Sequence, residues 1–179
     1  MRSQSLSRRA ARTFAWASTV WLLSVGFAAA TLPDWMTVKP QARLVVLALD
    51  AGIGDANGGL NYNGHHEGSH RLLIPQGWTV ILRMRNADSR VPHSALITRI
   101  YRQEDMPDRL SPQDAVFPGA ATAVPHSGTA AGGYAEFTFV ASKAGSYFVA
   151  CGVHTHLQAG MWLPLDIVEG LSEPAWRHE

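Results

Sequence analysis

Residues 147–162 read YFVACGVHTHLQAGMW, and this stretch decides how the rest of the chain is interpreted. It holds the only cysteine of the chain, Cys151, followed by His156 and Met161 at two successive steps of five residues. Thiolate, imidazole and thioether form a soft ligand set that favours copper, and two histidines, one cysteine and a distant methionine are the ligands of blue copper centres. One histidine is still missing, and His93 is the candidate for it. The spacing therefore predicts a copper site suited to electron transfer.

Each of these residues also has an ordinary explanation when it is taken alone. Cys151 could be a small buried hydrophobe, Met161 could belong to the core, and His93 could be a hydrogen-bonded residue near the end of a strand. A lone cysteine in an exported chain cannot form an internal disulfide, so it needs a reason of its own. The regular spacing of the set in one loop favours metal ligation over three separate explanations.

A second histidine, His154, competes with His156 for the role of ligand. A loop of the form Cys-x₂-His would place its methionine near position 159, which is Ala159. The spacing Cys-x₄-His-x₄-Met is satisfied only by His156. We therefore expect His154 at the surface of the loop, where it faces a partner.

The first 33 residues have the composition of an export segment. Residues 1–12 carry four arginines and no acid, and residues 13–32 contain no charge. A basic start, an apolar run and the small residues 28–30 are typical of a secretory signal peptide. The apolar run is also long enough to span a bilayer as a helix, with its amino end in the cytoplasm. We expect residues 1–33 to be either a cleaved signal peptide or a retained helical anchor of an exported protein, periplasmic or extracytoplasmic.

The net charge of the chain depends on that segment. Removing residues 1–30 takes away four arginines and no acid, so the formal charge changes from +1 to −3. The remaining domain has no basic patch to suggest nucleic acid as a partner.

The exported part reads as short strands separated by turns. Val80, Leu82 and Met84 alternate with Arg83 and Arg85, which is the period of a half-buried strand. Strands are predicted at residues 43–50, 69–74, 78–86, 93–102, 134–140, 145–151 and 161–169. Pro164 within the last run predicts an edge position or a bulge. About seven or eight short strands indicate an all-β sandwich or barrel.

The segments between these strands complete the expected organisation. The glycines of residues 52–64 lack the spacing of a phosphate-binding loop and are interpreted as turns and bulges. Residues 103–133 contain four prolines, and we expect short helical turns there that lie over the sandwich. We expect a linker at residues 34–41, one domain at 42–170 and a tail at 171–179.

Several segments resemble the cupredoxin family, and within it the sulfocyanin and rusticyanin group. They are the Cys151-x₄-His156-x₄-Gly160-Met161-Trp162 loop, VPHS at 91–94, LNYNG at 60–64, IPQGW at 74–78 and FPGA at 117–120. They occur in order over residues 42–169, which is nearly all of the exported domain. The chain departs from the family at His154-Thr155, where members commonly have Pro-Gly, and this difference concerns the rigidity of the loop.

The resemblance implies a Greek-key sandwich with one type 1 copper ion bound by His93, Cys151, His156 and Met161. It implies an electron carrier rather than an enzyme, in a respiratory chain outside the cytoplasmic membrane. A cytochrome or a terminal oxidase would then be the redox partner of a monomeric protein, anchored through residues 13–32 as sulfocyanins are. Ser94 matches a position that tunes the reduction potential in rusticyanin.

Two other functions remain open at this stage. A subunit of a copper enzyme, such as a multicopper oxidase or nitrite reductase, would need further histidine pairs. His154 with His156 is one such pair, and His65, His66 and His70 form a second cluster that either binds another metal weakly or is a solvated polar loop. A copper carrier would need an exchangeable site, often rich in methionine, but the five methionines are not clustered.

Overall fold

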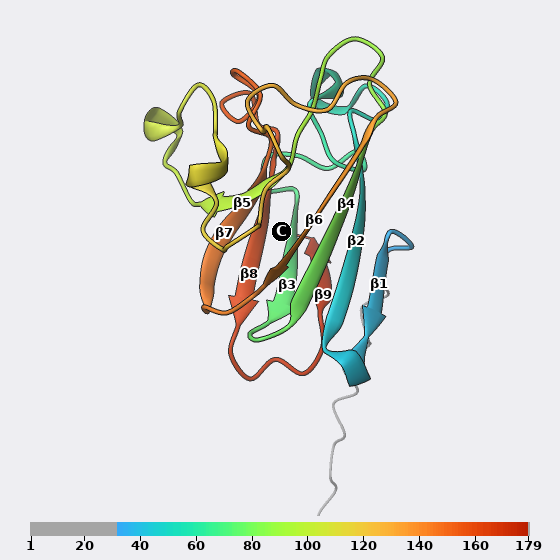
Figure 1. The fold of residues 1–179 in the computed structure, drawn as a ribbon, viewed down its shortest axis with the longest axis vertical. Helices are drawn as coiled ribbons and strands as arrows, with labels where there is room; N and C mark the ends of the chain where they lie inside the picture. Colours follow the sequence, from blue (N-terminus) through green and yellow to red (C-terminus); the bar gives the residue numbers. More distant parts are fainter. Residues whose placement is uncertain (1–31, 179) are drawn as a thin grey trace, which may run out of the picture.

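The computed structural model describes residues 32–178, in which two β-sheets face each other (Figure 1). One sheet has the order β1 (Met36–Lys39), β2 (Leu44–Ala51), β4 (Thr79–Asn86) and β6 (Tyr134–Val140). The other has the order β5 (Leu96–Arg99), β7 (Gly145–Ala150), β8 (Trp162–Val168), β3 (His70–Pro75) and β9 (Ala175–His178). The pairs β2–β4 and β3–β8 are parallel and the others antiparallel. The all-β sandwich predicted from the sequence is confirmed.

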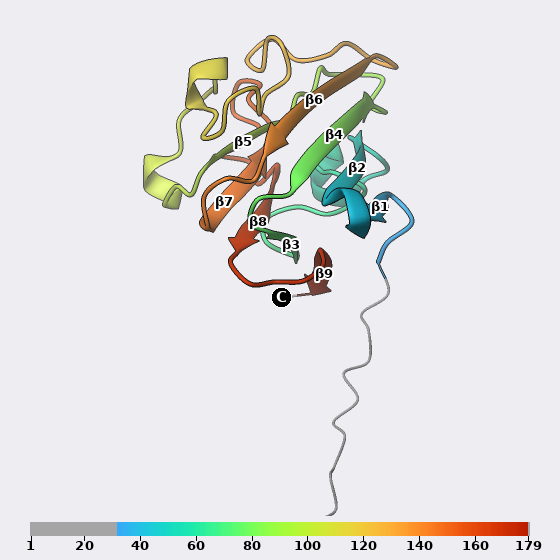
Figure 2. The same cartoon turned by 60° about the horizontal axis from the view of Figure 1, so that its bottom comes forward.

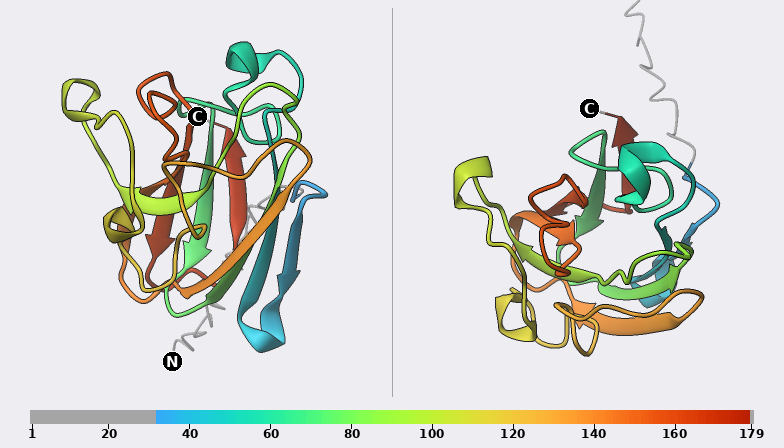
Figure 3. Two further views of the ribbon diagram at one scale, coloured as in Figure 1. Left: turned by 45° about the horizontal axis from the view of Figure 1, so that its top comes forward. Right: turned by 90° about the horizontal axis from the view of Figure 1, so that it is seen from above.

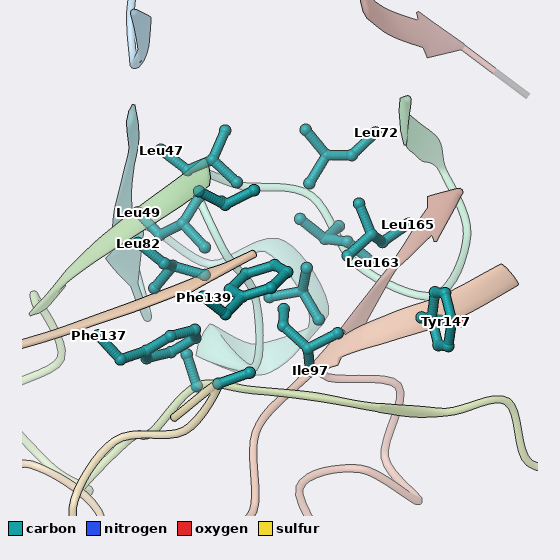
Figure 4. Close-up of a cluster of buried hydrophobic side chains, with 14 of the residues drawn as sticks. Leu47, Leu49, Leu72, Leu82, Ile97, Phe137, Phe139, Tyr147, Leu163 and Leu165 are labelled. Atoms are coloured by element: carbon teal, nitrogen blue, oxygen red, sulfur yellow. The ribbon is translucent and has the colours of Figure 1, made fainter. Parts of the chain in front are cut away.

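The core lies between the two sheets and follows the predicted alternation. Val80, Leu82 and Met84 of β4 are buried, whereas Arg83 points outward and pairs with Glu136 of β6 at 2.6 Å. Figure 4 shows leucines of β2 and β4 and phenylalanines of β6 meeting the leucines of β3 and β8. Each such side chain contributes about 1.5–3 kcal/mol when it leaves water. This packing gives the sandwich a rigid frame on which loops can be held.

The long connection between β5 and β6 contains the expected helical turns. The 3₁₀ turns η3 (Gln103–Asp105) and η4 (Pro112–Asp114) lie within it, beside β5 and β7 in Figure 2. A second small core forms beneath this connection from Leu96, Tyr101, Met106, Leu110, Phe148, Ala150 and Leu157. The connection is therefore packed onto the sheet and reaches the loop that carries His156.

The other predicted turns are also present. Two further 3₁₀ turns, η1 (Pro40–Ala42) and η2 (Ala56–Gly59), connect the early strands. Five glycines adopt positive φ in the glycine-rich stretch, as turns require: Gly52, Gly54, Gly58, Gly59 and Gly64.

The expectation that Pro164 marks an edge strand or a bulge is wrong. Strand β8 lies between β7 and β3, and its register with β7 runs without a break from Trp162 to Ile167. The pairing with β3 begins only at Leu165. Pro164 opposes Phe148 of β7 and lies before the β3 ladder starts, so its missing N–H group removes no hydrogen bond from that side.

Both ends of the described chain contribute strands. Strand β1 lies within the expected linker, and β9 within the expected tail. Figure 3 shows β9 beside β3 on the side that faces β1 and β2. Trp176 of β9 meets Trp35 edge to face, with ring centroids 4.9 Å apart, so the two sheets are joined here by aromatic packing.

Within residues 32–178 there is no helix of the length and apolarity that crossing a bilayer requires. The predicted signal peptide or anchor, including the apolar run at 13–32, falls almost entirely outside the described residues.

Candidate metal centre

Three of the four predicted ligands meet at one end of the sandwich. His93, Cys151 and His156 each place a donor atom within 4.8 Å of the other two. His93 and Cys151 are fully buried, and His156 is 8% exposed. Among the described residues this is the one group of three or more histidine, cysteine or acidic side chains whose donor atoms converge in this way.

The antiparallel pair β5–β7 brings His93 to Cys151. Leu96 at the start of β5 opposes Ala150 at the end of β7. Residues just before β5 and just after β7 must therefore lie at the same end of the sheet. His93 precedes β5 by three residues and Cys151 follows β7 directly, so the neighbouring strands place the imidazole beside the thiol, as the sequence suggested.

Two backbone hydrogen bonds fix His93. Its N–H group donates to the Thr129 carbonyl at 3.2 Å, and its own carbonyl accepts from the Thr129 N–H group at 2.7 Å. Both ring nitrogens are buried and lack a hydrogen-bond partner. A buried polar atom without a partner is costly, and here the cost falls on an atom that can bind a metal. Burial also lowers the pKa of His93, which keeps the ring in the neutral form that metals need.

The Cys151 thiol receives its contacts from two directions. The Ser94 N–H group donates to Sγ at 3.4 Å, and the Ser94 hydroxyl lies 3.6 Å from it. His156 Nδ1 is 3.4 Å from Sγ on another side. Because the Cys151 thiol is buried, solvent does not stabilise the thiolate, and the pKa of the thiol is raised. A bound cation is the natural source of that stabilisation.

A buried carboxylate stands behind His93. Asp88 is 4% exposed, and its Oδ2 lies 3.5 Å from His93 Nε2, too far for a strong hydrogen bond. Hydrogen bonds from Arg90 are the main cause that lowers the pKa of Asp88 to about 2, so the group stays ionised. Only a glycine fits at position 52, because a Cβ there would lie 2.6 Å from Asp88 Cβ and 2.8 Å from His93 Nε2. This pair was not predicted from the sequence, although an acid five residues before a candidate ligand was a readable signal.

The loop of residues 151–161 closes on itself through its backbone. The Met161 N–H group donates to the His156 carbonyl at 2.9 Å, and the Cys151 N–H group donates to the Met161 carbonyl at 3.1 Å. Burial, and then the neighbouring His93, lowers the pKa of His156 to about 4, so this ring is also neutral at pH 7. Met161 is fully buried in the same loop.

One residue of this loop has a strained backbone. Thr155 has φ +65°, in the left-handed region that β-branched residues rarely adopt. Its N–H group donates to the Asp108 carbonyl at 2.6 Å, and the Asp108 carboxylate lies 3.2 Å from His154 Nδ1. His154 is exposed, as expected. Thr155 stands where the sequences that this loop resembles commonly have glycine. The hydrogen bond to Asp108 holds the Thr155 backbone in place.

Three other histidines form a different kind of cluster. His65 and His70 contact Trp176, and His178 contacts His70; we call these four residues the histidine–tryptophan cluster. The His70 ring stacks on Trp176 at 4.8 Å between centroids, and His65 and His178 meet His70 at 4.3 and 4.7 Å. Their donor atoms do not converge within 4.8 Å as those around Cys151 do. The neighbouring His66 has a buried Nδ1 without a hydrogen-bond partner.

The residues around Cys151 fit a copper ion. The set offers one thiol and two neutral imidazoles in a buried site, with both ring nitrogens of His93 unpartnered. Soft sulfur together with imidazole suits copper better than a hard cation such as Mg²⁺.

Comparison with known proteins agrees with this geometry. A family model described as the sulfocyanin (SoxE) domain matches residues 34–176. The sulfocyanin of Sulfolobus acidocaldarius is 29% identical over 117 residues, which cover 64% of this chain and 58% of that protein. The match thus spans less than two thirds of the relative's length.

Two solved structures show the same fold at low identity. Auracyanin A, a "blue" copper protein from Chloroflexus aurantiacus, is 17% identical with a TM-score of 0.50, over 70% of this chain and 99% of that one. A laccase from Pediococcus acidilactici is 16% identical with a TM-score of 0.52, over 79% of this chain and 29% of that one. The family model covers most of the chain, and the sandwich and its His–Cys–His group agree with it: the chain belongs to the sulfocyanin family of cupredoxins.

Proposed function

We propose that this protein carries single electrons at one type 1 copper ion bound by His93, Cys151, His156 and Met161. The observation that supports this most is the buried convergence of His93, Cys151 and His156 within 4.8 Å. Bound copper would supply the redox chemistry by alternating between its two oxidation states. The chain's own residues hold the donors in one geometry.

Rigidity is what these residues contribute to electron transfer. Backbone hydrogen bonds hold His93 to Thr129 and close the loop from Cys151 to Met161. The imidazoles are neutral before a metal binds, so no proton has to leave them at neutral pH. Donors that do not move between oxidation states keep the reorganisation small, which favours fast transfer.

His156 is the proposed point of contact with a partner. It is the most exposed of the four residues, at 8%, whereas the other three are fully buried. An electron that reaches the site from a docked protein would meet this ring before the thiol. Val153 and the exposed His154 lie next to it in the loop and would form part of the contact surface.

We further propose an extracytoplasmic place in a respiratory chain. The partner would be a redox protein such as a cytochrome or a terminal oxidase, and the protein would act as a monomer. Residues 1–33 would serve as a signal peptide or as an anchor through residues 13–32, ahead of the folded domain. The laccase similarity covers 29% of that enzyme and shows a shared fold, so it does not favour an oxidase over a carrier.

Copper titration of the purified chain tests this function. At one equivalent of Cu(II) we expect an intense visible band from thiolate-to-copper charge transfer and an EPR signal with narrow parallel hyperfine splitting. Electrochemistry of the same sample should show a reversible one-electron couple. A colourless protein, or one with only an ordinary type 2 copper signal, would contradict the proposal.

A further inference from the structure

Tyr62 is a fully buried tyrosine whose hydroxyl reaches the candidate metal centre. The side chain is 0% exposed, and its hydroxyl donates to the Ser94 carbonyl at 2.5 Å. The two residues are 32 positions apart in sequence. Burying a phenol is costly unless its hydroxyl finds a partner. The partner here is the residue that follows the proposed ligand His93.

Ser94 in turn contacts the sulfur through two groups. Its N–H group donates to Cys151 Sγ at 3.4 Å, and its hydroxyl lies 3.6 Å from the same atom. The Ser94 hydroxyl oxygen already accepts the Gly152 N–H group at 2.8 Å, so its own proton is free to point at the sulfur. Ser94 is thus held by Tyr62 on one side and by the Cys151 segment on the other.

The backbone around Tyr62 is itself fixed. Tyr62 and His65 exchange two hydrogen bonds, of 2.9 and 2.8 Å, and the next residue, Asn63, donates to the Asp50 carbonyl at 2.8 Å. The phenol therefore links this fixed turn to Ser94. Burial first, and then the charge of Cys151, raises the pKa of Tyr62, so the hydroxyl keeps its proton.

Donors that point at a copper-bound sulfur withdraw electron density from it and favour the reduced site. We propose that Tyr62 is a positioning residue that holds Ser94 against the Cys151 sulfur and thereby raises the reduction potential of the centre. The inference rests on the proposed copper function. Without the Tyr62 hydroxyl, Ser94 loses its anchor, its two contacts with the sulfur loosen, and the potential falls.

The test is Tyr62→Phe, with Tyr147→Phe as the matched control. Tyr147 is also buried, and its hydroxyl also donates to a backbone carbonyl, that of Lys143 at 3.0 Å. It lies on β7, four residues before Cys151, so both variants lose the same kind of hydrogen bond. We expect Tyr62→Phe to lower the ratio of reduced to oxidised protein at a fixed ambient potential about tenfold, which corresponds to ~59 mV. Tyr147→Phe should lose folding stability but keep the wild-type potential.

A second measurement uses the metal-free protein. The Ser94 amide should exchange slowly with solvent in the wild type and in Tyr147→Phe, and faster in Tyr62→Phe. An unshifted potential in Tyr62→Phe, or equal shifts in both variants, would overturn the inference. If Tyr62→Phe does not fold, a wild-type Ser94 amide that exchanges like an exposed loop amide would overturn it, and a protected one would support it. A wild type without a blue band overturns the proposed function instead, so the two failures are distinguishable.

Discussion

The molecule has two histidine-rich regions that differ in burial and in the groups that their histidines contact. Around Cys151, two buried histidines meet a thiol, and His93 has no hydrogen-bond partner for either ring nitrogen. In the histidine–tryptophan cluster the histidines are more exposed: His65 and His70 pack against each other and against Trp176, and His178 packs against His70. A count of histidines would favour the second region as the metal site. The structure favours the first, because burial without a partner prepares a nitrogen for a metal.

The second region has a structural explanation that needs no metal. Strand β9 pairs only with β3, and His70 opposes His178 in that ladder. Aromatic contacts with Trp176 add to the few hydrogen bonds of a four-residue strand. The histidine–tryptophan cluster therefore attaches β9 to β3, whereas the Cys151 region holds a buried thiol beside two buried imidazoles.

The largest expected effect separates the two regions completely. Cys151→Ser should abolish the blue band and the one-electron couple while the sandwich remains folded, because the sulfur is the source of both. His70→Gln should leave the band at full intensity at one equivalent of copper. Absorption spectra and circular dichroism of the two variants provide the check. A Cys151→Ser protein that stays blue would refute the proposed ligand set.

Met161→Leu should have the next largest effect. The site should remain blue, but its potential should rise, because the loss of a thioether donor destabilises Cu(II) more than Cu(I). We expect about a tenfold change in the ratio of reduced to oxidised protein at fixed potential, or ~59 mV. Met84→Leu, in the buried core on β4, is the volume-matched control and should leave the potential unchanged. A wild-type potential in Met161→Leu would mean that Met161 is not the axial ligand.

Thr155→Gly tests whether the left-handed backbone conformation of Thr155 destabilises the folded protein. Glycine adopts φ +65° without a clash, so the free energy of unfolding of the metal-free protein should rise by about 1 kcal/mol. Thr138→Gly, on the exposed face of β6 and outside the left-handed region, should lower it by about 0.5–1 kcal/mol. Urea denaturation of both variants shows whether the free energy of unfolding rises or falls. Equal destabilisation would show that the Thr155 backbone carries no strain.

The smallest effect concerns the response of the histidine–tryptophan cluster to pH. Burial is the main cause that lowers the pKa values of His65 and His70, and their histidine neighbours add to it. The unfolded chain therefore binds protons first as the pH falls below about 6.5, and stability decreases from there toward the folded pKa values. The slope of unfolding free energy against pH should be smaller in His70→Gln than in the wild type. Parallel curves would contradict this.

The main features of the site could be predicted because they are local in sequence. Cys151, His156 and Met161 share one loop, and His93 could be added because a neighbouring strand would bring it close. The structure brings His93, Cys151 and His156 together. Their role as ligands, and that of Met161, stays a prediction. Most strands followed from alternation, since one face of each must be buried.

Other features depend on contacts that no local pattern contains. Tyr62 reaches Ser94 across 32 residues, and only the register of the folded strands decides where its hydroxyl lies. Pro164 suggested an edge because the start of the β3 ladder at Leu165 could not be read from the sequence. Strand β9 was not predicted, because four residues are too few for an alternating pattern to stand out. The strand forms through its pairing with β3.

The compactness of the Cys151–Met161 loop has a consequence for the coupling of metal binding to folding. Three of the four proposed ligands lie within 11 residues, so an unfolded chain can already chelate copper through them. A ligand that binds both states stabilises the native one only by the difference between its two affinities. If His93 is a ligand as proposed, most of that difference would come from it, because the β5–β7 pairing brings it to the site. Copper should therefore raise the melting temperature less than its affinity for the native protein suggests, and an unfolded chain should capture the metal before it folds.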